Sequence, residues 1–253
     1  MRLENKVALI TSVGQERGIG RGIARVFASE GADMVLNSSR QSSVDGACKE
    51  VQTLGRKAVG LAGDAANRDV CQGLVELAKS EYGQLDVVVC NAGANPRKPL
   101  EETSVEEAMR TIEVNFFGTF HLCQLACKAM KERGGSIVII TSVHAESAYR
   151  NSSIYNFTKA GLNHFAASLG MEWTRYKIRV NALEPGWIQT PGSTGQMTDS
   201  EIDRAEKTVI PWGRMGQAED IGHAVAFLAS DEADYVTASC MRVDGGLIAA
   251  ASI

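Results

Sequence analysis

The sequence predicts an α/β protein with one parallel β-sheet that is covered by helices on both faces. Short apolar or β-branched runs alternate with longer amphipathic segments along almost the whole chain, and this order is typical of a doubly wound parallel sheet. Several runs are apolar at consecutive positions, as expected for strands that are buried on both faces. The 253 residues contain no linker, repeat or low-complexity segment, which favours one domain over residues 1–253.

Seven runs are the predicted strands, and they lie at residues 7–11, 34–36, 58–61, 87–90, 137–141, 180–183 and 241–243. The helical patterns between them include residues 22–30, 70–82, 105–133, 154–176 and 218–230. Two stretches depart from this alternation: a polar loop at 91–99 and an excursion at about 186–216. Because ligands of open α/β sheets bind beyond the carboxyl ends of the strands, both are candidate pocket walls. The second has the length and glycine content of a substrate lid.

The composition and charge exclude several classes of function. The chain is 44% hydrophobic and 22% charged, and its net charge of −4 is spread over interleaved acids and bases. This pattern argues against a nucleic-acid or anionic-membrane partner. Six scattered cysteines without a CxxC pair predict reduced, mostly buried thiols, with no disulfide framework and no metal site. No stretch reaches the ~18 apolar residues of a membrane span, and no signal peptide is evident, so we expect a cytoplasmic protein.

A glycine-containing loop joins the first predicted strand to the first predicted helix. Glycines allow backbone amides to approach a pyrophosphate, and a helix N-terminus offers unpaired N–H groups. The position of this loop in an alternating chain therefore predicts a dinucleotide site. The loop residues expected to line it are Ser12, Gly14, Arg17, Gly18, Ile19 and Gly20.

The end of the second predicted strand indicates which dinucleotide binds. An acidic residue there would bind the ribose 2′-hydroxyl and repel a 2′-phosphate. This chain instead has Ser38, Ser39 and Arg40, two hydroxyls and a guanidinium that suit a phosphate. Arg17 could reach the same phosphate. The residues favour NADP(H), with NAD(H) as the alternative.

Two further segments are predicted to contact the adenosine part of the cofactor. Asp64, with Ala65 beside it, follows the third strand and is the expected adenine contact. Asn91, Ala92 and Gly93 follow the fourth strand and are expected to pack around the adenosine ribose.

A tyrosine and a lysine define the candidate catalytic centre. Tyr155 and Lys159 are four residues apart on a predicted helix, which places them on one face. A cation that close lowers the tyrosine pKa, which is ordinarily near 10. Such a tyrosine can exchange a proton with a substrate hydroxyl or carbonyl. Ser142 stands upstream, at the end of the fifth predicted strand.

With these motifs the chain resembles the short-chain dehydrogenases/reductases over essentially its whole length. The matching residues are Gly18-Ile19-Gly20, Asn91-Ala92-Gly93, Asn115, Ser142, Tyr155, Lys159, Pro185-Gly186, Thr190 and Asp244-Gly245-Gly246. The resemblance implies a Rossmann-type sheet of about seven parallel strands. It also implies a homotetramer or homodimer that is built on helices such as 105–131 and 153–176.

The resemblance also implies roles for individual residues. Tyr155 would transfer the proton to or from the substrate oxygen while hydride moves at the nicotinamide, and Lys159 would lower its pKa and bind the nicotinamide ribose. Ser142 would hold and polarise the substrate oxygen. Asn115 would bind a water that connects Lys159 to solvent, through a local disruption of its helix. The residues that would border the nicotinamide are Pro185, Gly186, Ile188 and Thr190.

Three positions depart from the family pattern. The usual Thr-Gly opening of the glycine loop is Thr11-Ser12 here, and Gly14 is a candidate to replace the missing glycine in a loop about two residues longer. Glu184 replaces an Asn or Gly before Pro185, which would place a carboxylate near the nicotinamide. Ala238 stands where a late Thr-Gly dipeptide usually has its glycine.

The substrate pocket is expected to be lined by residues 93–98, 143–150 and 186–212. His144 with Glu146 nearby is similar to the corresponding segment of the glucose 1-dehydrogenases of this family, which suggests a substrate with several hydroxyls. The alternative is a surface or helix-capping histidine. Arg150, Glu184 and Trp187 are further candidate substrate residues, although a packing role in the lid is favoured for Trp187 over contact with a sugar.

These observations predict an NADP(H)-preferring oxidoreductase that interconverts a secondary alcohol or hemiacetal and a carbonyl, with a sugar or polyol favoured. The alternative substrate is a 3-oxoacyl thioester on acyl carrier protein, which would need a basic rim such as Arg97, Lys98 and Arg150 could supply. The alternative of another class is a catalytically silent dinucleotide sensor. Such sensors commonly lose the tyrosine or lysine, and this chain retains both.

Overall fold

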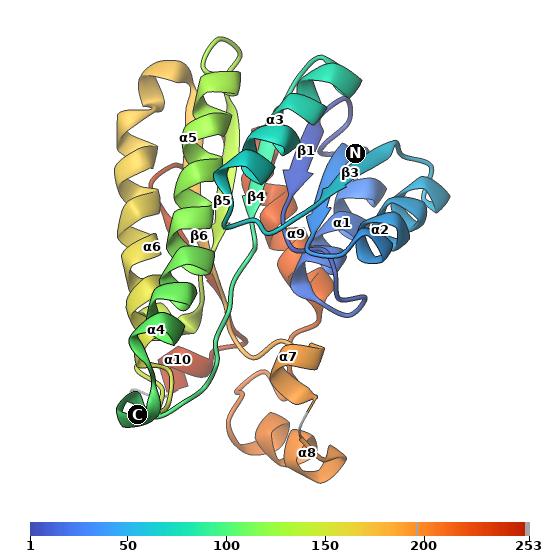
Figure 1. Cartoon of the computed structure of the whole chain (residues 1–253). Coiled ribbons are helices and arrows are strands. Elements are labelled where there is room, and N and C mark those ends of the chain that lie inside the picture. Colours follow the sequence, from blue (N-terminus) through green and yellow to red (C-terminus); the bar gives the residue numbers. More distant parts are fainter. Residues whose placement is uncertain (196, 251–253) are drawn as a thin grey trace.

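Seven parallel strands form one sheet in the order β3-β2-β1-β4-β5-β6-β7 (Figure 1). The computed structural model describes residues 1–195 and 197–250. The order reverses direction between β1 and β4, and such a switch point is where doubly wound sheets bind ligands. All seven predicted strands are present, as β1 (Val7–Ile10), β2 (Asp33–Ser38), β3 (Ala58–Ala62), β4 (Val87–Cys90), β5 (Gly135–Ile140), β6 (Ile178–Pro185) and β7 (Cys240–Val243).

Helices cover both faces of the sheet, as the sequence predicts. One face carries α1 (Ile19–Ser29), α2 (Gln41–Thr53) and α9 (Ala218–Ala229), and the other carries α3 (Arg68–Tyr82), α5 (Gly118–Met130) and α6 (Ser153–Glu172) (Figure 1). On β1, Ala8 and Ile10 belong to the first core and Val7 and Leu9 to the second. This alternation follows from the two-residue period of a strand. The short elements are η1 (Leu100–Glu102), η3 (Val143–Ala145), η4 (Thr174–Tyr176), η5 (Asp231–Ala233) and α10 (Leu247–Ala250).

The helical pattern at 105–133 is interrupted by one π-helical turn. It consists of α4 (Val105–Ile112), the π-turn η2 (Glu113–Phe117) and α5. Asn115 lies within the π-turn and is fully buried. The local disruption expected at Asn115 is therefore present, and such turns often occur at functional sites.

The excursion at 186–216 contains α7 (Pro191–Thr194) and α8 (Asp199–Thr208). Both lie beyond one end of the sheet in Figure 1. The excursion is anchored by a small third core in which Ala205, Ile210 and Met215 join Val143 and Leu247. This core connects the excursion to the segment that follows β5, so the two can form walls of one cavity.

The cysteines and helices bear on two expectations about the environment. All six cysteines are free thiols, as expected, but Cys240 is exposed because it lies on the edge strand β7. Within residues 1–195 and 197–250, no helix is long and apolar enough to cross a membrane.

Candidate active site

Two adjoining cavities open at the carboxyl edge of the sheet. A groove of about 500 Å³ runs along the glycine loop and the ends of β2 and β3. A second cavity of about 320 Å³ lies at the ends of β5 and β6. The two share the lining residues Ile19, Asn91, Gly93, Thr190 and Gly192. A molecule bound in the groove can therefore reach into the second cavity.

The glycine loop is shaped for a close approach of its backbone. Ser12 adopts a left-handed conformation with φ of 59°, a region that glycine usually occupies. Gly14 was the candidate replacement, but it has no positive φ. Its role is packing instead, because a Cβ at Gly14 would overlap Ser38 Oγ. A Cβ at Gly20 would lie 2.6 Å from both Asn91 Nδ2 and the Ser12 carbonyl oxygen.

The first turn of α1 faces the groove and fits a phosphate. Gly18 is its N-cap and supplies no side-chain hydrogen bond, and Gly18, Ile19 and Gly20 line the groove. Uncapped N–H groups and the positive end of the helix dipole are a ready site for an anion. Together with the packed glycines, this arrangement fits the pyrophosphate of a dinucleotide.

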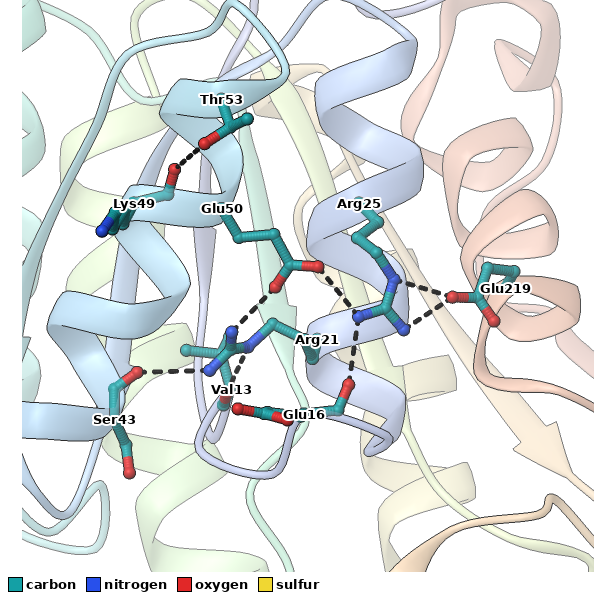
Figure 2. A network of polar contacts seen from close by, with 9 residues as sticks. All are labelled: Val13, Glu16, Arg21, Arg25, Ser43, Lys49, Glu50, Thr53 and Glu219. Carbon is teal, nitrogen blue, oxygen red and sulfur yellow. Dashed lines mark hydrogen bonds and ion pairs between the residues drawn. The ribbon is translucent and has the colours of Figure 1, made fainter.

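A partly buried ion-pair network supports the loop from behind (Figure 2). Arg21 donates to the Val13 carbonyl at 3.0 Å and to Glu50 of α2 at 2.8 Å. Arg25, one turn later on α1, binds Glu50 and Glu219 of α9, and it donates to the carbonyl of Glu16 in the loop at 3.0 Å. Two arginines thus tie the loop backbone to α2 and α9.

The far end of the groove contains the residues expected at a 2′-phosphate. Ser38 is buried, Ser39 and Arg40 are exposed, and all three line the groove. Arg40 makes no ion pair with any described residue. Arg17 is exposed and does not line the groove, and Gln15 does so instead. The contact predicted between Arg17 and a 2′-phosphate therefore stays a prediction.

The adenosine end of the groove includes an arginine that sequence reasoning missed. Asp64, Ala65 and Ala92 line the groove as predicted. Arg110 of α4 also lines it and forms an ion pair with Asp64. The backbone N–H of Ala66 also binds Asp64, and despite the opposing effect of burial its pKa is lowered. No local pattern connects residues 64 and 110, so only the fold brings them together.

The four predicted catalytic residues converge at the border of the two cavities. Ser142, Tyr155 and Lys159 line the second cavity, and the Ser142 side chain acts to lower the pKa of the Tyr155 phenol. Lys159 Nζ donates to the Ile140 carbonyl at 2.8 Å and lies 5.5 Å from the centroid of the Tyr155 ring. Asn115 accepts from Ala94 N at 2.7 Å.

The electrostatics differ from the sequence expectation at the tyrosine. Burial lowers the pKa of Lys159 to about 8. Burial raises the pKa of Tyr155, while the Ser142 hydrogen bond and the charge of Arg97 oppose that rise. The expected lowering by Lys159 is therefore not what this structure shows. The reason is that the ammonium is directed at the Ile140 carbonyl and the phenol loses hydration.

His144 lines the cavity in a defined orientation. Asn156 Nδ2 donates to the Tyr149 carbonyl at 3.1 Å, so Asn156 Oδ1 faces His144 Nδ1 at 2.7 Å. Because that oxygen can only accept, Nδ1 carries the proton and Nε2 is the unprotonated nitrogen. The ring stacks on Tyr149 with centroids 4.0 Å apart. Burial lowers the pKa of His144, which favours the neutral ring.

The remaining candidate substrate residues fall into two groups. Trp187 lines the cavity, together with Asn95 and Arg97 from the polar loop and Pro185, Gly186 and Ile188 from the next segment. Arg150 is exposed and lies outside the cavity lining. Glu184 is also outside it, because strand alternation directs its side chain toward α6, where it binds Asn163. Neither Arg150 nor Glu184 is therefore part of the cavity lining, and the substrate contacts predicted for them stay predictions.

Within the described parts of the chain, no group of three or more His, Cys, Asp or Glu residues could hold a metal ion. The acid/base groups of the cavity are a phenol, an ammonium and an imidazole beside a groove that fits a dinucleotide. Fold and site together define a dinucleotide-dependent oxidoreductase.

Comparisons with known proteins give the same class. A family model described as enoyl-(acyl carrier protein) reductase matches residues 13–248. The 3-oxoacyl-[acyl-carrier-protein] reductase of Thermotoga maritima is 36% identical over 98% of this chain and 100% of its own. The L-rhamnose 1-dehydrogenase (NAD(P)(+)) of a Sphingomonas species is 34% identical over 97% of each chain. A 7α-hydroxysteroid dehydrogenase solved with NADH and 7-oxo glycochenodeoxycholic acid is 34% identical, covers 97% of this chain and 95% of its own, and superposes with a TM-score of 0.91.

This chain therefore belongs to the short-chain dehydrogenase/reductase family. The three relatives act on, or are solved with, an acyl thioester, a sugar and a steroid, as their names state. Family membership establishes an oxidoreductase and leaves the substrate to the individual cavity.

Proposed function

We propose that this protein is an NADP(H)-preferring oxidoreductase that interconverts a secondary alcohol or hemiacetal and a carbonyl. The observation that carries the proposal is the convergence of Ser142, Tyr155 and Lys159 in one cavity that adjoins the cofactor groove. When bound, the cofactor supplies or accepts the hydride. The protein's contribution is to position the substrate oxygen and to move its proton.

Tyr155 is the proposed acid/base. Tyr155 and Ser142 line the same cavity, so a substrate oxygen bound between their hydroxyls would meet two donors at once. Lys159 is proposed to bind the nicotinamide ribose and to stabilise the phenolate electrostatically. Asn115 is proposed to hold the water that connects Lys159 to solvent, with the π-turn keeping its side chain beside Ala94.

A substrate with several hydroxyl groups is favoured by His144. With Nδ1 committed to Asn156, the unprotonated Nε2 is the ring atom that can accept a hydrogen bond from a substrate hydroxyl. Arg97 and Asn95 add polar groups to the same cavity. A sugar or polyol is therefore the first proposal, and the segment at 186–216, with Trp187 in the wall, is proposed to act as the substrate lid.

The preference for NADP(H) is supported by Ser38, Ser39 and Arg40 in the groove and by the absence of an acid among these three. Arg40 is proposed to bind the 2′-phosphate as a charge-assisted contact. Replacement of Arg40 by Ala should then raise the Kd for NADPH by about tenfold or more and leave that for NADH nearly unchanged. An equal effect on both cofactors would refute the preference.

Reduction of a 3-oxoacyl thioester on acyl carrier protein is the second candidate. It is supported by Arg97 in the cavity lining and by exposed Arg150, which directly follows Tyr149 of that lining. Lys98, the third member of the proposed basic rim, is paired with Glu107, which weakens this rim.

We also propose a homotetramer or homodimer. Apolar side chains are exposed on α4, η2 and α6, and they are Val105, Met109, Phe117, Phe157 and Met171. Large apolar side chains exposed on neighbouring helices commonly mark an interface between subunits. Light scattering coupled to size exclusion would measure the mass, and a monomer at micromolar concentration would contradict the proposal.

The function is tested by absorbance at 340 nm in a substrate screen. Both oxidised cofactors are paired with sugars and polyols, and both reduced cofactors with 3-oxoacyl thioesters and simple ketones. Turnover of a sugar with NADP⁺ is expected, and Tyr155→Phe should lose turnover while it still binds NADPH. Turnover of a thioester alone would replace the sugar by the second candidate. Tight NADPH binding without any turnover would favour a silent dinucleotide sensor.

A further inference from the structure

A buried carboxyl group without a cation lies between α6 and β7. Glu184 is fully buried on β6, and its Oε1 accepts a hydrogen bond of 2.5 Å from Asn163 Nδ2. Its Oε2 is also buried and has no hydrogen-bond partner among the described residues. Two neighbouring groups act on this carboxyl group: Glu146 raises the pKa of Glu184, and the Cys240 thiol lowers it. Glutamate is almost never fully buried unless it is paired, so the missing partner needs a physical explanation.

The neighbouring arginine does not neutralise Glu184. Arg242 lies beside Glu184 in the register of β6 and β7, but its guanidinium is paired with Glu146 and Asp244. Two adjacent carboxyl groups, one of them removed from water, disfavour a second negative charge, because desolvation and like-charge repulsion act together. Burial is the largest cause that raises the pKa of Glu184, and Glu146 adds to it.

We propose that Glu184 is a positioning residue that keeps its proton at neutral pH and uses it to hold the substrate wall of the active site. The O–H on Oε2 donates to the Glu146 carboxylate, which Arg242 binds as an ion pair. This proton gives Oε2 the partner that it otherwise lacks, and Asn163 holds Oε1. We refer to this arrangement of Glu184, Glu146, Arg242 and Asn163 as the carboxyl clamp.

The carboxyl clamp connects the two walls of the catalytic cavity. Glu146 directly follows η3, which carries His144, and Ser142 caps η3 by accepting a hydrogen bond of 3.2 Å from His144 N. Glu184 lies on the strand that leads to Gly186 of the cavity lining. If Glu184 lost its proton, two carboxylates would repel across a buried contact and displace η3. The effect on turnover rests on the proposed function, since it requires Ser142 and His144 in their proposed roles.

The titratable or charged groups packed around Glu184 are Glu146 after η3, Cys240, Arg242 and Asp244 on or after β7, and Lys159 one turn before Asn163 on α6. Although Cys240 as a residue is exposed, partial desolvation of its thiol, with Glu184 as a further cause, raises the thiol pKa to about 12. This thiol therefore stays neutral across the working range. Lys159, with a pKa of about 8, is the group whose titration has to be separated from that of Glu184.

The proton itself is tested by carbon-13 NMR of the protein with its Glu carboxyl carbons labelled. The resonance that Glu184→Gln removes is that of Glu184. We expect it to titrate well above the ordinary range of a glutamate carboxyl group, because burial and the neighbouring Glu146 both raise its pKa. Titration near the ordinary value would overturn the carboxyl clamp, and this readout does not depend on any activity of the protein.

The effect on catalysis is tested by the pH dependence of kcat/KM for the wild type and for Glu184→Gln, Glu184→Ala and the exposed control Glu172→Gln. Glutamine keeps a donor for Glu146 and an acceptor for Asn163 but does not titrate. We expect kcat/KM of Glu184→Gln to stay within about threefold of the wild-type value at neutral pH. In this variant the decrease of kcat/KM at alkaline pH that ionisation of Glu184 causes should be absent. In Glu184→Ala, kcat/KM should fall by about tenfold or more.

Two results would overturn the positioning role. One is a decrease of kcat/KM at alkaline pH in Glu184→Gln that coincides with the decrease in the wild type. The other is a loss at neutral pH that is as large in Glu184→Gln as in Glu184→Ala. If the alanine variant fails to fold, the comparison of the glutamine variant with the wild type decides alone. Absence of turnover in the wild type itself would refute the proposed function, while the NMR titration would still decide whether Glu184 holds the proton.

Discussion

Replacement of Arg21 by alanine should disturb the cofactor groove from behind. Arg21 is 5% exposed and does not line either cavity, yet it holds the Val13 carbonyl of the glycine loop and Glu50 of α2 (Figure 2). A weaker contact of 3.4 Å reaches the Ser43 carbonyl at the start of α2. The substitution therefore removes one of the two arginine connections between the loop and α2, and Arg25 keeps the other. Neither cavity loses a lining side chain.

The magnitude follows from the groups that are left behind. Val13 is fully buried, and loss of the donor to its carbonyl costs about 1–3 kcal/mol. Truncation of the side chain removes two buried methylene groups at about 0.8 kcal/mol each. Glu50 keeps its ion pair with Arg25, so no unpaired carboxylate is added. We expect the free energy of unfolding to fall by about 3–4 kcal/mol.

The assay combines urea unfolding with NADPH binding measured by fluorescence. A loop that has lost its support should raise the Kd for NADPH by about tenfold, or 1.4 kcal/mol. Glu219→Gln is the matched control, because Glu219 contacts Arg25 on the α9 side of the same network; it should change either quantity by less than about 1 kcal/mol. An unchanged Kd in Arg21→Ala would refute the positioning of the loop, even if the protein were less stable.

Three further predictions concern single positions. Lys159 has a pKa of about 8 in the folded protein and an ordinary value of 10.5, so between these pH values the unfolded chain binds one proton more than the folded chain. The free energy of unfolding without cofactor should therefore rise by about 3 kcal/mol from pH 8 to 10.5. Urea titrations of Lys159→Met should show a flatter rise, and an unchanged pH dependence in this variant would contradict the burial effect. Ala238 has φ of 57°, so Ala238→Gly should raise the thermal midpoint, equivalent to about 1 kcal/mol, and a lowered midpoint would show that the conformation is not strained. Gly20→Ala should abolish NADPH binding, because the added Cβ would lie 2.6 Å from Asn91 Nδ2. Gly161→Ala is the control, and it should bind NADPH normally because the space around the added methyl group is open. Retained binding in Gly20→Ala would refute the close approach.

The sequence by itself determined the sheet and the set of residues at its carboxyl edge. Each predicted strand is present because a buried strand needs a short apolar run, and that signal is contained in the run itself. Tyr155 and Lys159 meet because a helix places residues four apart on one face. Ser142 and the glycine loop were found at strand ends, which a parallel sheet brings to one edge.

The tertiary structure decided what each of those residues touches. Alternation along β6 placed Glu184 on the same face as Ala182, but only the packing of α6 put Asn163 against it. The Asp64 ion pair with Arg110 joins elements that are far apart in the chain. The raised pKa of Tyr155 depends on how much water its neighbours exclude. The spacing of residues along the chain predicts which side chains share a face of one helix or strand. Burial, ion pairing and the state of charge depend on the other elements that pack against that face. A single sequence contains little information about which elements those are.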